Sequence, residues 1–421
     1  MQAAIIRRIM RNRNVVNIIG AGLAGMEAGL FLAGHGVKVH IFNNGKIYRD
    51  SQSDMEKLSP SGELYDKLLT QELSLLGSPL ARKKDQLERS KSNCIDQLLL
   101  SYGLDMISDN ENIEVFDANV KNINPMELTI IATGPKTGDE LFDYLIDKYG
   151  TMKCVNALPI YPIIDGIDEV YLYHKEGDTY FLSISEEEYN DLVKEIIKQA
   201  VEERKSVEEF KLYQNTVEDL ALHYRENLRS YSLKPQRVNE GDKPYATMVL
   251  KKVEDGYVLQ GISSDLPQVR QYKILSTLKA FRNFKFVKIA GVNKGKFINP
   301  IHMTTQFCQS RQEENVFFAG GIMGIGGNIN SIASGMWTAM NVLRKVENKN
   351  MVKMPLGCAF GKFIQTLTGD NLARIRPLIK CEDIINIAQG EDIEKFIISS
   401  FEQSQRALEQ FKEEYKNGKY V

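Results

Sequence analysis

The sequence predicts an α/β fold built around a parallel sheet, and three observations predict it. An apolar run at 15–19 leads directly into the spacing G-x-G-x-x-G at 20–25. A second small-residue turn, IIATGP, occupies 130–135, and a third, rich in glycine, lies within 315–335. Each turn follows an apolar run, and the first and third precede a helical pattern, which is typical of strand–turn–helix units that bind nucleotides.

The composition is that of an ordinary globular protein with two or three domains. The chain has 421 residues, 43% of them hydrophobic and 26% charged, and a net charge of −2. This balance gives no support for nucleic-acid binding through bulk charge, although it is compatible with a local basic face. The apolar runs are shorter than the ~20 residues of a membrane-spanning helix, so we expect no membrane segment.

The five cysteines are scattered, without the C-x-x-C spacing of a zinc site or the density of a disulfide framework. They indicate a reducing compartment, and we expect a cytoplasmic protein without a metal site. Residues 1–13 hold four arginines and no acid, and they lack the apolar core and cleavage site of a secretory signal. We interpret them as a basic N-terminal extension.

The order of the expected elements divides the chain into a discontinuous nucleotide-binding domain, 14–150 and 289–421, and an α+β insertion domain, 151–288. A helix at 24–34 lies between two apolar strands, as in a β-α-β crossover. In the insertion, a charged amphipathic run at 185–210 predicts one or two solvated helices. The remaining expected elements are strands at 37–42, 113–116, 128–132, 170–173, 180–183 and 315–319, helices at 62–76 and 331–345, and a hairpin of 245–251 with 257–261.

The first glycine turn has the residues that a dinucleotide requires. Gly20 permits the tight turn, Gly22 lets backbone approach a pyrophosphate, and Gly25 lets helix and strand pack closely. The helix that begins at Leu23 and Ala24 offers its N–H groups to the phosphates. We therefore predict that all five residues bind a cofactor.

The end of the second strand departs from the usual pattern. The acid that would hold the ribose hydroxyls falls on Asn43, which can form hydrogen bonds but binds a diol less tightly than a carboxylate. The alternative is that Asn43 only begins a loop. Glu27, two residues after the last glycine, is a position where flavoproteins often carry a glutamate.

Two further turns favour a flavin over a nicotinamide cofactor. The turn at 130–135 can lie against the dinucleotide, and the helix after the last glycine turn can face the flavin end. Three such elements in this order predict the FAD/NAD(P)-binding Rossmann-like fold of the glutathione-reductase type. The additional cofactor-binding candidates are Ala132, Thr133, Gly134, Gly320, Gly321, Gly327, Asn328 and Ile329.

These motifs resemble those of the folate- and FAD-dependent tRNA uracil-5-methyltransferases, the TrmFO or Gid family, over most of the chain. IIGAGLAG and IIATGP match in order, followed by FIN at 297–299, QF at 306–307, FFAG and SIASG. The combination of FIN, FFAG and SIASG is more specific than a generic flavin signature. The resemblance implies FAD as the cofactor, with methylenetetrahydrofolate and NAD(P)H as further candidates, and tRNA or rRNA as the substrate.

The resemblance also implies a mechanism with two cysteines, one attacking the target uracil and one assisting proton removal. A thiolate suits this chemistry because it is a strong nucleophile near neutral pH. At the two family positions this sequence has Pro60 and Gln214. The chain is therefore a divergent member of the family by resemblance, and its catalytic residues are unknown.

Three functions stay open at this point. The first is methylenetetrahydrofolate-dependent methylation of uracil C5 in RNA, with a changed catalytic group. The second is an FAD flavoprotein, an oxidase or a carrier, that has lost methyl transfer, since a reduced flavin can react with small acceptors without cysteine. The third is a non-catalytic binding or structural paralogue.

Basic residues provide the candidate contacts with substrate. Lys294 and Lys296 are candidates for contact with RNA phosphate or a folate tail, and solvated loop lysines are the alternative. A basic strip without acids runs through 270–288 and is the candidate RNA-facing surface, with a solvated helix face as the alternative. Its members are Arg270, Lys273, Lys279, Arg282, Lys285 and Lys288.

Overall fold

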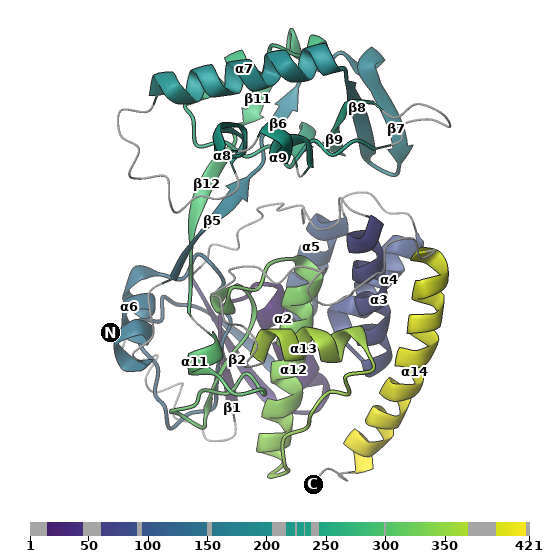
Figure 1. Ribbon diagram of the computed structural model, residues 1–421. Helices are drawn as coiled ribbons and strands as arrows, with labels where there is room; N and C mark the ends of the chain where they lie inside the picture. The colour runs from purple at the N-terminus through teal and green to yellow at the C-terminus, as the bar shows by residue number, and fades with distance from the viewer. Residues whose placement is uncertain are drawn as a thin grey trace. The chain divides into compact units, whose positions relative to one another are not determined.

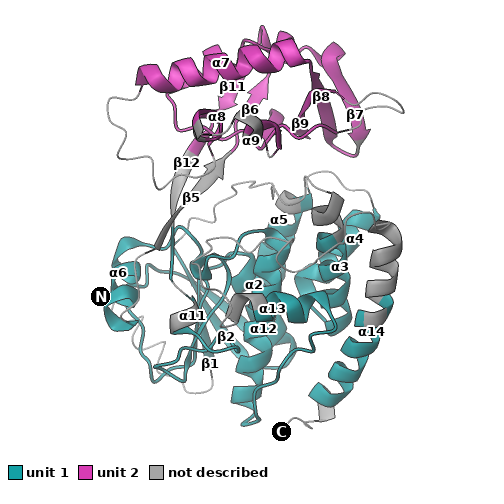
Figure 2. Ribbon diagram, viewed as in Figure 1, with its two compact units in different colours: residues 1–90, 95–155, 296–421 teal, residues 91–94, 156–295 magenta. Residues whose placement is uncertain are grey.

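A five-stranded parallel sheet organises the first of the two compact units into which the chain divides (Figure 2). Unit 1 comprises residues 1–90, 95–155 and 296–421, and unit 2 comprises residues 91–94 and 156–295. The expected N-terminal extension and Gln214 lie outside the described residues. The computed structural model describes residues 15–44, 60–90, 95–149, 154–203, 216–223, 225–230, 232–236, 244–298, 300–368 and 393–417.

All neighbouring strands of the unit 1 sheet run parallel, in the order β13-β4-β1-β2-β3. Their carboxyl ends therefore share one edge, and the three small-residue turns follow β1, β4 and β13 at that edge. This topology confirms the predicted α/β fold. The strands are β1 (Val15–Ile19), β2 (Lys38–Asn43), β3 (Ile113–Asp117), β4 (Thr129–Ile131) and β13 (Val316–Phe318).

Helices α2 (Leu23–Gly34) and α12 (Asn328–Val346) pack closely against each other within unit 1 (Figure 1). Helix α2 has no polar face, and every residue from Ala24 to Ala33 is buried. Gly335 permits the approach of α12, because a Cβ there would lie 2.3 Å from the carbonyl oxygen of Ala24. The other helices of this unit are α3 (Pro60–Leu76), α4 (Pro79–Arg89), α5 (Ile95–Ser108), α6 (Asp139–Tyr149), α11 (Pro300–Met303), α13 (Ala359–Thr368) and α14 (Ile393–Asn417).

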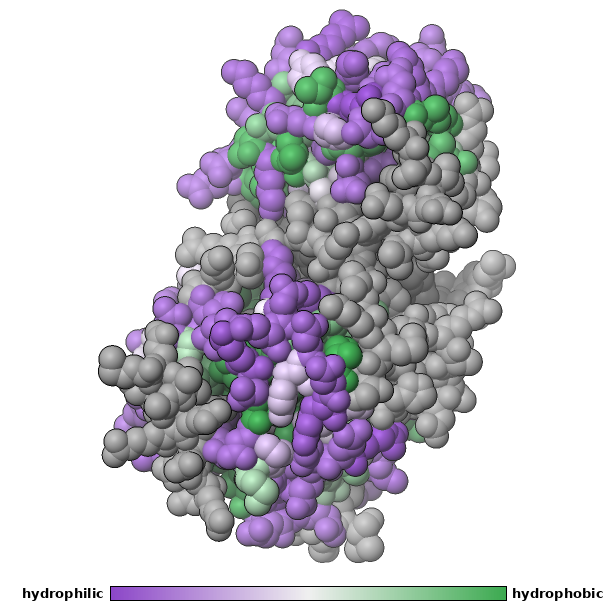
Figure 3. Space-filling model, turned by 90° about the vertical axis from the view of Figure 1, so that its left-hand side faces the viewer, coloured by the Kyte–Doolittle hydropathy of each residue, from purple (hydrophilic) through white to green (hydrophobic). Residues whose placement is uncertain are grey.

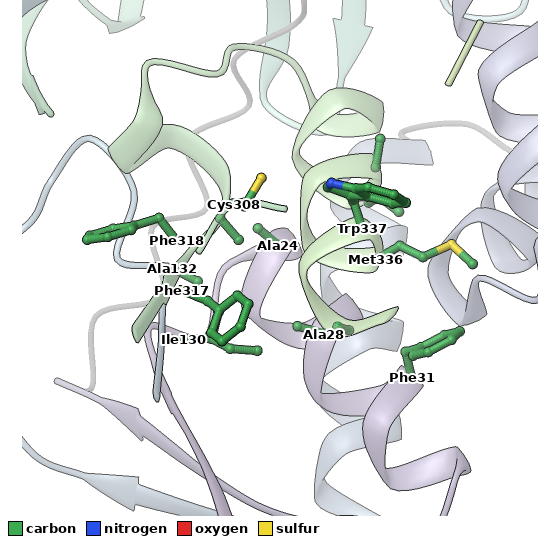
Figure 4. Close-up of a cluster of buried hydrophobic side chains, with 14 of the residues drawn as sticks. Ala24, Ala28, Phe31, Ile130, Ala132, Cys308, Phe317, Phe318, Met336 and Trp337 are labelled. Carbon is green, nitrogen blue, oxygen red and sulfur yellow. The ribbon is translucent and has the colours of Figure 1, made fainter. Parts of the chain in front are cut away.

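The core of unit 1 includes the side chains between the sheet and these two helices, and it continues to buried residues of α3, α4, α6 and α13. Figure 4 shows Phe317 of β13 beside Ile130 of β4, and Ala24 of α2 beside α12. Trp337 of α12 is 1% exposed, and its indole N–H donates a hydrogen bond to the carbonyl oxygen of Gln306 at 3.0 Å. The buried indole therefore has its polar group satisfied, and Trp337 packs the core.

Unit 2 is a six-stranded antiparallel sheet, in the order β11-β6-β10-β9-β8-β7, with helices packed on it. Helix α7 (Glu186–Glu203) buries Tyr189, Val193 and Ile196 and exposes most of its acids, which confirms the predicted amphipathic helix. The predicted hairpin is also confirmed, as β9 and β10. The remaining elements are β6 (Ile163–Asp165), β7 (Leu172–Glu176), β8 (Thr179–Ile184), β9 (Ala246–Val253), β10 (Gly256–Gln260), β11 (Lys285–Lys288), α8 (Val217–His223), α9 (Arg225–Ser230) and α10 (Gln268–Leu275).

One expected strand begins later than the sequence predicted. The prediction was a strand at 170–173, but a 3-10 turn spans Glu169–Tyr171 and β7 starts at Leu172. The side chain of Asp168 accepts a hydrogen bond from the backbone N–H of Val170 at 3.3 Å. That bond satisfies a donor which a strand would otherwise pair with its neighbour, so the local turn prevails.

Strands β5 (Cys154–Ile160) and β12 (Gly291–Phe297) pair with each other where the chain passes between the units. None of the helices in the described ranges combines the length and apolar character that a membrane crossing requires. On the face in Figure 3, hydrophilic residues cover most of the described surface, and apolar residues form small separate groups.

Candidate functional site

The first glycine turn lies where β1 ends and is held against two neighbouring strands. Gly20 has φ +108°, and its N–H donates a hydrogen bond to the carbonyl oxygen of Phe42 at 2.8 Å. A Cβ at Gly20 would lie 2.4 Å from the carbonyl oxygen of Ala132. Only glycine fits this conformation and this contact, so the turn is fixed between the ends of β2 and β4.

Gly25 and Gly22 have different structural roles in this turn. A Cβ at Gly25 would lie 2.0 Å from the carbonyl oxygen of Gly20, so Gly25 lets the first turn of α2 rest on the glycine turn. Gly22 is the N-cap of α2 and has no side-chain cap, and a Cβ there would meet no atom of the described residues within 4 Å. Among the described residues, the N-terminus of α2 is therefore open on the side of Gly22, which suits a phosphate at the positive end of the helix.

The loop after β4 is a second wall of this cradle. Ala132 is buried, and Gly134 has φ +69°. The hydroxyl of Thr137 donates to the carbonyl oxygen of Gly134 at 2.7 Å and lies 2.5 Å from the hydroxyl of Thr133. Because Thr137 has one proton to give, Thr133 is the donor in the second bond. These bonds fix the loop beside Gly20.

The third turn, between β13 and α12, packs on the start of α2. Gly320 has φ +72°, and a Cβ there would lie 2.8 Å from the Cβ of Ala24. A Cβ at Gly321 would lie 2.7 Å from Pro135 Cδ, in the loop after β4. Gly327, with φ +87°, is the N-cap of α12 and has no side-chain cap. The structure thus brings all three predicted turns together.

The first turn of α12 contains the last predicted cofactor-binding residues. Asn328 begins the helix, and Ile329 is 3% exposed in the core. The next residue, Asn330, was not among the candidates; its side-chain oxygen accepts from the Tyr65 hydroxyl at 2.9 Å, and its amide donates to the carbonyl oxygen of Gly326 at 3.0 Å. The bond from Tyr65 ties α12 to α3, a contact for which the sequence contains no local signal.

Asn43 is the last residue of β2, next to the glycine turn. Its carbonyl oxygen accepts a hydrogen bond from the N–H of Ala118 at 2.8 Å, and its side chain is half-buried. In the parallel ladder with β3, Asn43 is paired directly with Asp117. The edge of the sheet beside the cradle therefore carries an amide and, one strand away, a carboxylate.

The side chain of Glu27 interacts with helix α4 and not with the residues of the cradle. Its Oε2 accepts a hydrogen bond from the backbone N–H of Leu80 at 3.0 Å, at the N-terminus of α4. Burial raises the pKa of this carboxyl from 4.5 to about 7, against the opposing effect of that hydrogen bond and of Ser78. Glu27 is thus a buried acid that joins α2 to α4.

The residues present fit a dinucleotide. Two helices begin at uncapped glycines, the space at Gly22 is open, and the backbone of three turns meets at the carboxyl edge of a parallel sheet. That edge is where open α/β sheets bind their ligands. The cradle would hold a pyrophosphate through backbone N–H groups, without requiring a charged side chain.

The predicted substrate-binding cations that the structure describes are engaged within the protein. The ammonium of Lys296 pairs with Asp139 and donates to the carbonyl oxygen of Thr137 at 3.0 Å. The guanidinium of Arg270 pairs with Glu202 at 2.9 Å and with Glu203. Lys294 lies in β12, and its side chain is not among those that the structure describes. Their roles in substrate binding stay predictions.

Among the described residues, no reactive thiol is found for the candidate catalytic chemistry. Pro60 is the first residue of α3, where a proline is well tolerated. Cys308 and Cys358 are both buried, and burial raises the pKa of each thiol to about 12. A thiol of that kind is almost entirely protonated near neutral pH and reacts slowly.

We expect Cys308 and Cys358 to resist alkylation in the folded protein. Treatment with iodoacetamide at pH 8 should leave both unmodified, whereas the same treatment in denaturant should modify both, because unfolding exposes the thiols and returns their pKa to its usual range. Peptide mass spectrometry measures the two yields. Rapid native modification of either thiol would contradict its assignment as a buried, unreactive side chain.

Comparisons with known proteins agree with this geometry. Residues 15–350 match the family model described as GIDA, glucose inhibited division protein A. The chain is 28% identical over 425 residues to the methylenetetrahydrofolate–tRNA-(uracil-5-)-methyltransferase TrmFO 1 of Mesoplasma florum, across 94% of this chain and 96% of that protein. It is 27% identical over 392 residues to the corresponding TrmFO of Thermotoga petrophila, across 85% and 89% of the two chains.

Among solved structures, the chain is similar to GidA of Aquifex aeolicus in its form II crystal. The TM-score is 0.66, with 12% identity, across 96% of this chain and 73% of that one. A form I crystal of the same protein gives the same TM-score. At this identity the similarity supports the fold.

Proposed function

The chain belongs to the GIDA family, glucose inhibited division protein A, and on that premise we propose that it binds FAD and acts on RNA. The activity that its relatives' names give is methylenetetrahydrofolate-dependent methylation of uracil at C5 in tRNA. We propose the same reaction class for this chain, on tRNA or rRNA, with catalytic groups other than the family's cysteines.

The observation that carries the proposal is the cradle formed by three turns. Gly20 and Gly22 would receive the pyrophosphate together with the N-terminus of α2. The uncapped N-terminus of α12, at Gly327, would face the flavin end and stabilise negative charge there. When bound, FAD would supply the chemistry of reduction and one-carbon transfer, with NAD(P)H as the candidate reductant.

A second candidate function is an FAD flavoprotein that no longer transfers a methyl group. The family's cysteine positions hold Pro60 and Gln214, and the described cysteines, Cys308 and Cys358, are buried. Loss of a covalent nucleophile commonly costs several orders of magnitude in rate. This observation favours an oxidase or a carrier, and the experiment below separates the two functions.

The first experiment is the absorption spectrum of the purified full chain, followed by acid release and identification of the cofactor. A flavin spectrum with FAD released is the expected result. The protein is then supplied with NAD(P)H, methylenetetrahydrofolate labelled in its one-carbon unit, and unmodified tRNA or rRNA. Label at uracil C5 supports methylation, whereas flavin reduction without label supports the second candidate. A colourless protein that cannot be reconstituted with FAD overturns both and leaves a non-catalytic paralogue.

The proposal further assigns contact with RNA to the basic strip at 270–288. The strip is not a single helix face, because it continues from α10 through a 3-10 turn into β11. Arg270 and Lys279 have acidic partners, the latter Glu188 at 3.8 Å. Within the described residues, Lys273, Arg282 and Lys285 are exposed and form no ion pair. These three side chains are the strip's available charges for phosphate.

We expect the triple substitution Lys273→Ala, Arg282→Ala and Lys285→Ala to weaken tRNA binding and flatten its salt dependence. Each lost phosphate contact should lower the slope of log affinity against log salt by about 0.7–0.9. Filter binding at several salt concentrations measures both quantities. Arg270→Ala is the matched control, because its charge is already paired; an unchanged slope in the triple variant would exclude the strip.

A further inference from the structure

The carboxyl ends of β2 and β3 form a small polar edge beside the glycine turn. Gly20 donates to the carbonyl oxygen of Phe42 at 2.8 Å, so the next residue, Asn43, lies directly beside the turn. Ala118 donates to the carbonyl oxygen of Asn43, also at 2.8 Å, so the end of β3 follows immediately. Across this edge the order is glycine turn, Asn43, then Asp117.

Asn43 and Asp117 present their side chains on the same face of the sheet. They are direct partners in a parallel ladder, and neighbouring strands are about 4.8 Å apart. Ile41, two residues before Asn43, shares that face, and its Cδ1 would lie 3.1 Å from a Cβ at Gly29 of α2. The pair therefore faces the α2 side of the sheet, where the cradle is.

The opposite face of the same strands carries a different pair. His40 and Glu114 are also direct partners, and His40 Nε2 lies 3.6 Å from Glu114 Oε2. Glu114 is thus an exposed acid of β3 that already has a partner and lies on the face away from α2. By contrast, Asp117 is exposed, and no described residue forms an ion pair or hydrogen bond with its carboxylate.

The chemistry of this edge matches the diol of a ribose. Two vicinal hydroxyls donate hydrogen bonds, and a carboxylate is a pure acceptor that binds both more strongly than a neutral amide does. In dinucleotide folds that acceptor follows the second strand, where this chain has Asn43. Asp117 lies one strand further from the glycine turn, on the correct face.

We propose that Asp117 supplies the carboxylate that accepts hydrogen bonds from the adenosine ribose, with Asn43 beside it as a neutral partner. The inference rests on the proposed binding of FAD. It means that ribose recognition is kept in this chain but has moved from the end of β2 to the end of β3.

The test measures binding of ADP and of 2′,3′-dideoxy-ADP to the full chain by isothermal titration calorimetry, with FAD binding as a separate measurement. The wild type should bind ADP about tenfold more tightly than dideoxy-ADP. The Asp117→Asn variant should lose this preference, because its affinity for ADP should fall while its affinity for dideoxy-ADP stays the same. Glu114→Gln, which removes a negative charge from the same strand on the other face, should keep it.

The exchange variant Asn43→Asp with Asp117→Asn returns the carboxylate to β2 and should recover the preference for ADP. It also keeps the test decisive if Asp117→Asn alone fails to fold. A wild type that binds FAD and ADP without discriminating dideoxy-ADP, or an Asp117→Asn variant that still discriminates, overturns the inference and leaves FAD binding intact. A wild type that binds neither FAD nor ADP overturns the proposed function itself.

Discussion

Gly25→Ala is expected to destabilise the protein severely, whereas Gly22→Ala, three residues earlier, is expected to leave it folded. The new Cβ at Gly25 would lie 2.0 Å from the carbonyl oxygen of Gly20, a backbone atom that cannot move without opening the turn. Overpacking of this kind costs about 1–3 kcal/mol, and more where backbone must shift. Urea unfolding followed by circular dichroism measures the loss.

At Gly22 the added methyl group meets no atom of the described residues within 4 Å, and alanine readily adopts φ −78°. Stability should change by less than about 1 kcal/mol. FAD binding should nevertheless weaken at least tenfold, because the methyl group occupies the space where phosphate would approach the N-terminus of α2. A Gly22→Ala protein that binds FAD as the wild type does would show that the cofactor does not use this cradle.

Glu27→Gln is expected to remove a pH-dependent loss of stability. Burial raises the pKa of this carboxyl from 4.5 to about 7 in the folded protein. Between those values the folded chain holds a proton that the unfolded chain has released, so the free energy of unfolding falls as pH rises. Below pH 4.5 there is no such loss, and above about pH 7 it is complete, at about 3 kcal/mol.

The stability difference between Glu27→Gln and wild type should therefore shift in favour of the variant by up to about 3 kcal/mol between pH 4.5 and pH 8. Using a difference cancels the parallel contributions of Glu72 and Glu218, whose pKa values burial also raises. Glutamine keeps an acceptor for the N–H of Leu80, while Glu27→Ala, the matched control, leaves that donor unpaired. A difference that stays constant with pH would contradict the buried-acid assignment.

The fold was predictable because its signals are local. An apolar run at 15–19, a turn that needs positive φ at Gly20, and a helix apolar on all sides can each be read from a short stretch of sequence. The predicted helix at 62–76 and the hairpin of β9 and β10 follow the same rule. Helices α4, α5, α6, α13 and α14 were not predicted, although α4, α6, α13 and α14 each have an apolar face and a polar face; such helices take most of their stability from the surface they pack on.

The site was predictable only in part, because side-chain partners are chosen by packing. Glu27 has the position of a flavoprotein glutamate, yet the structure pairs it with Leu80 of α4. Lys296 was a candidate for substrate, yet its ammonium is taken by Asp139. Likewise, Arg270 of the basic strip forms ion pairs with Glu202 and Glu203, which are distant in sequence.

By itself, the sequence determined the α/β fold and the three turns of the cradle, and it predicted Pro60 and Gln214 at the family's cysteine positions. A positive φ, a close backbone approach and the identity of a residue are each properties of a few adjacent residues, so they can be recognised in the sequence. Only the tertiary structure decided which charges are available. The register of the strands placed Asn43 beside Asp117, and packing buried Glu27 against the N-terminus of α4. Register and burial depend on the whole sheet and its helices, and no local stretch specifies them.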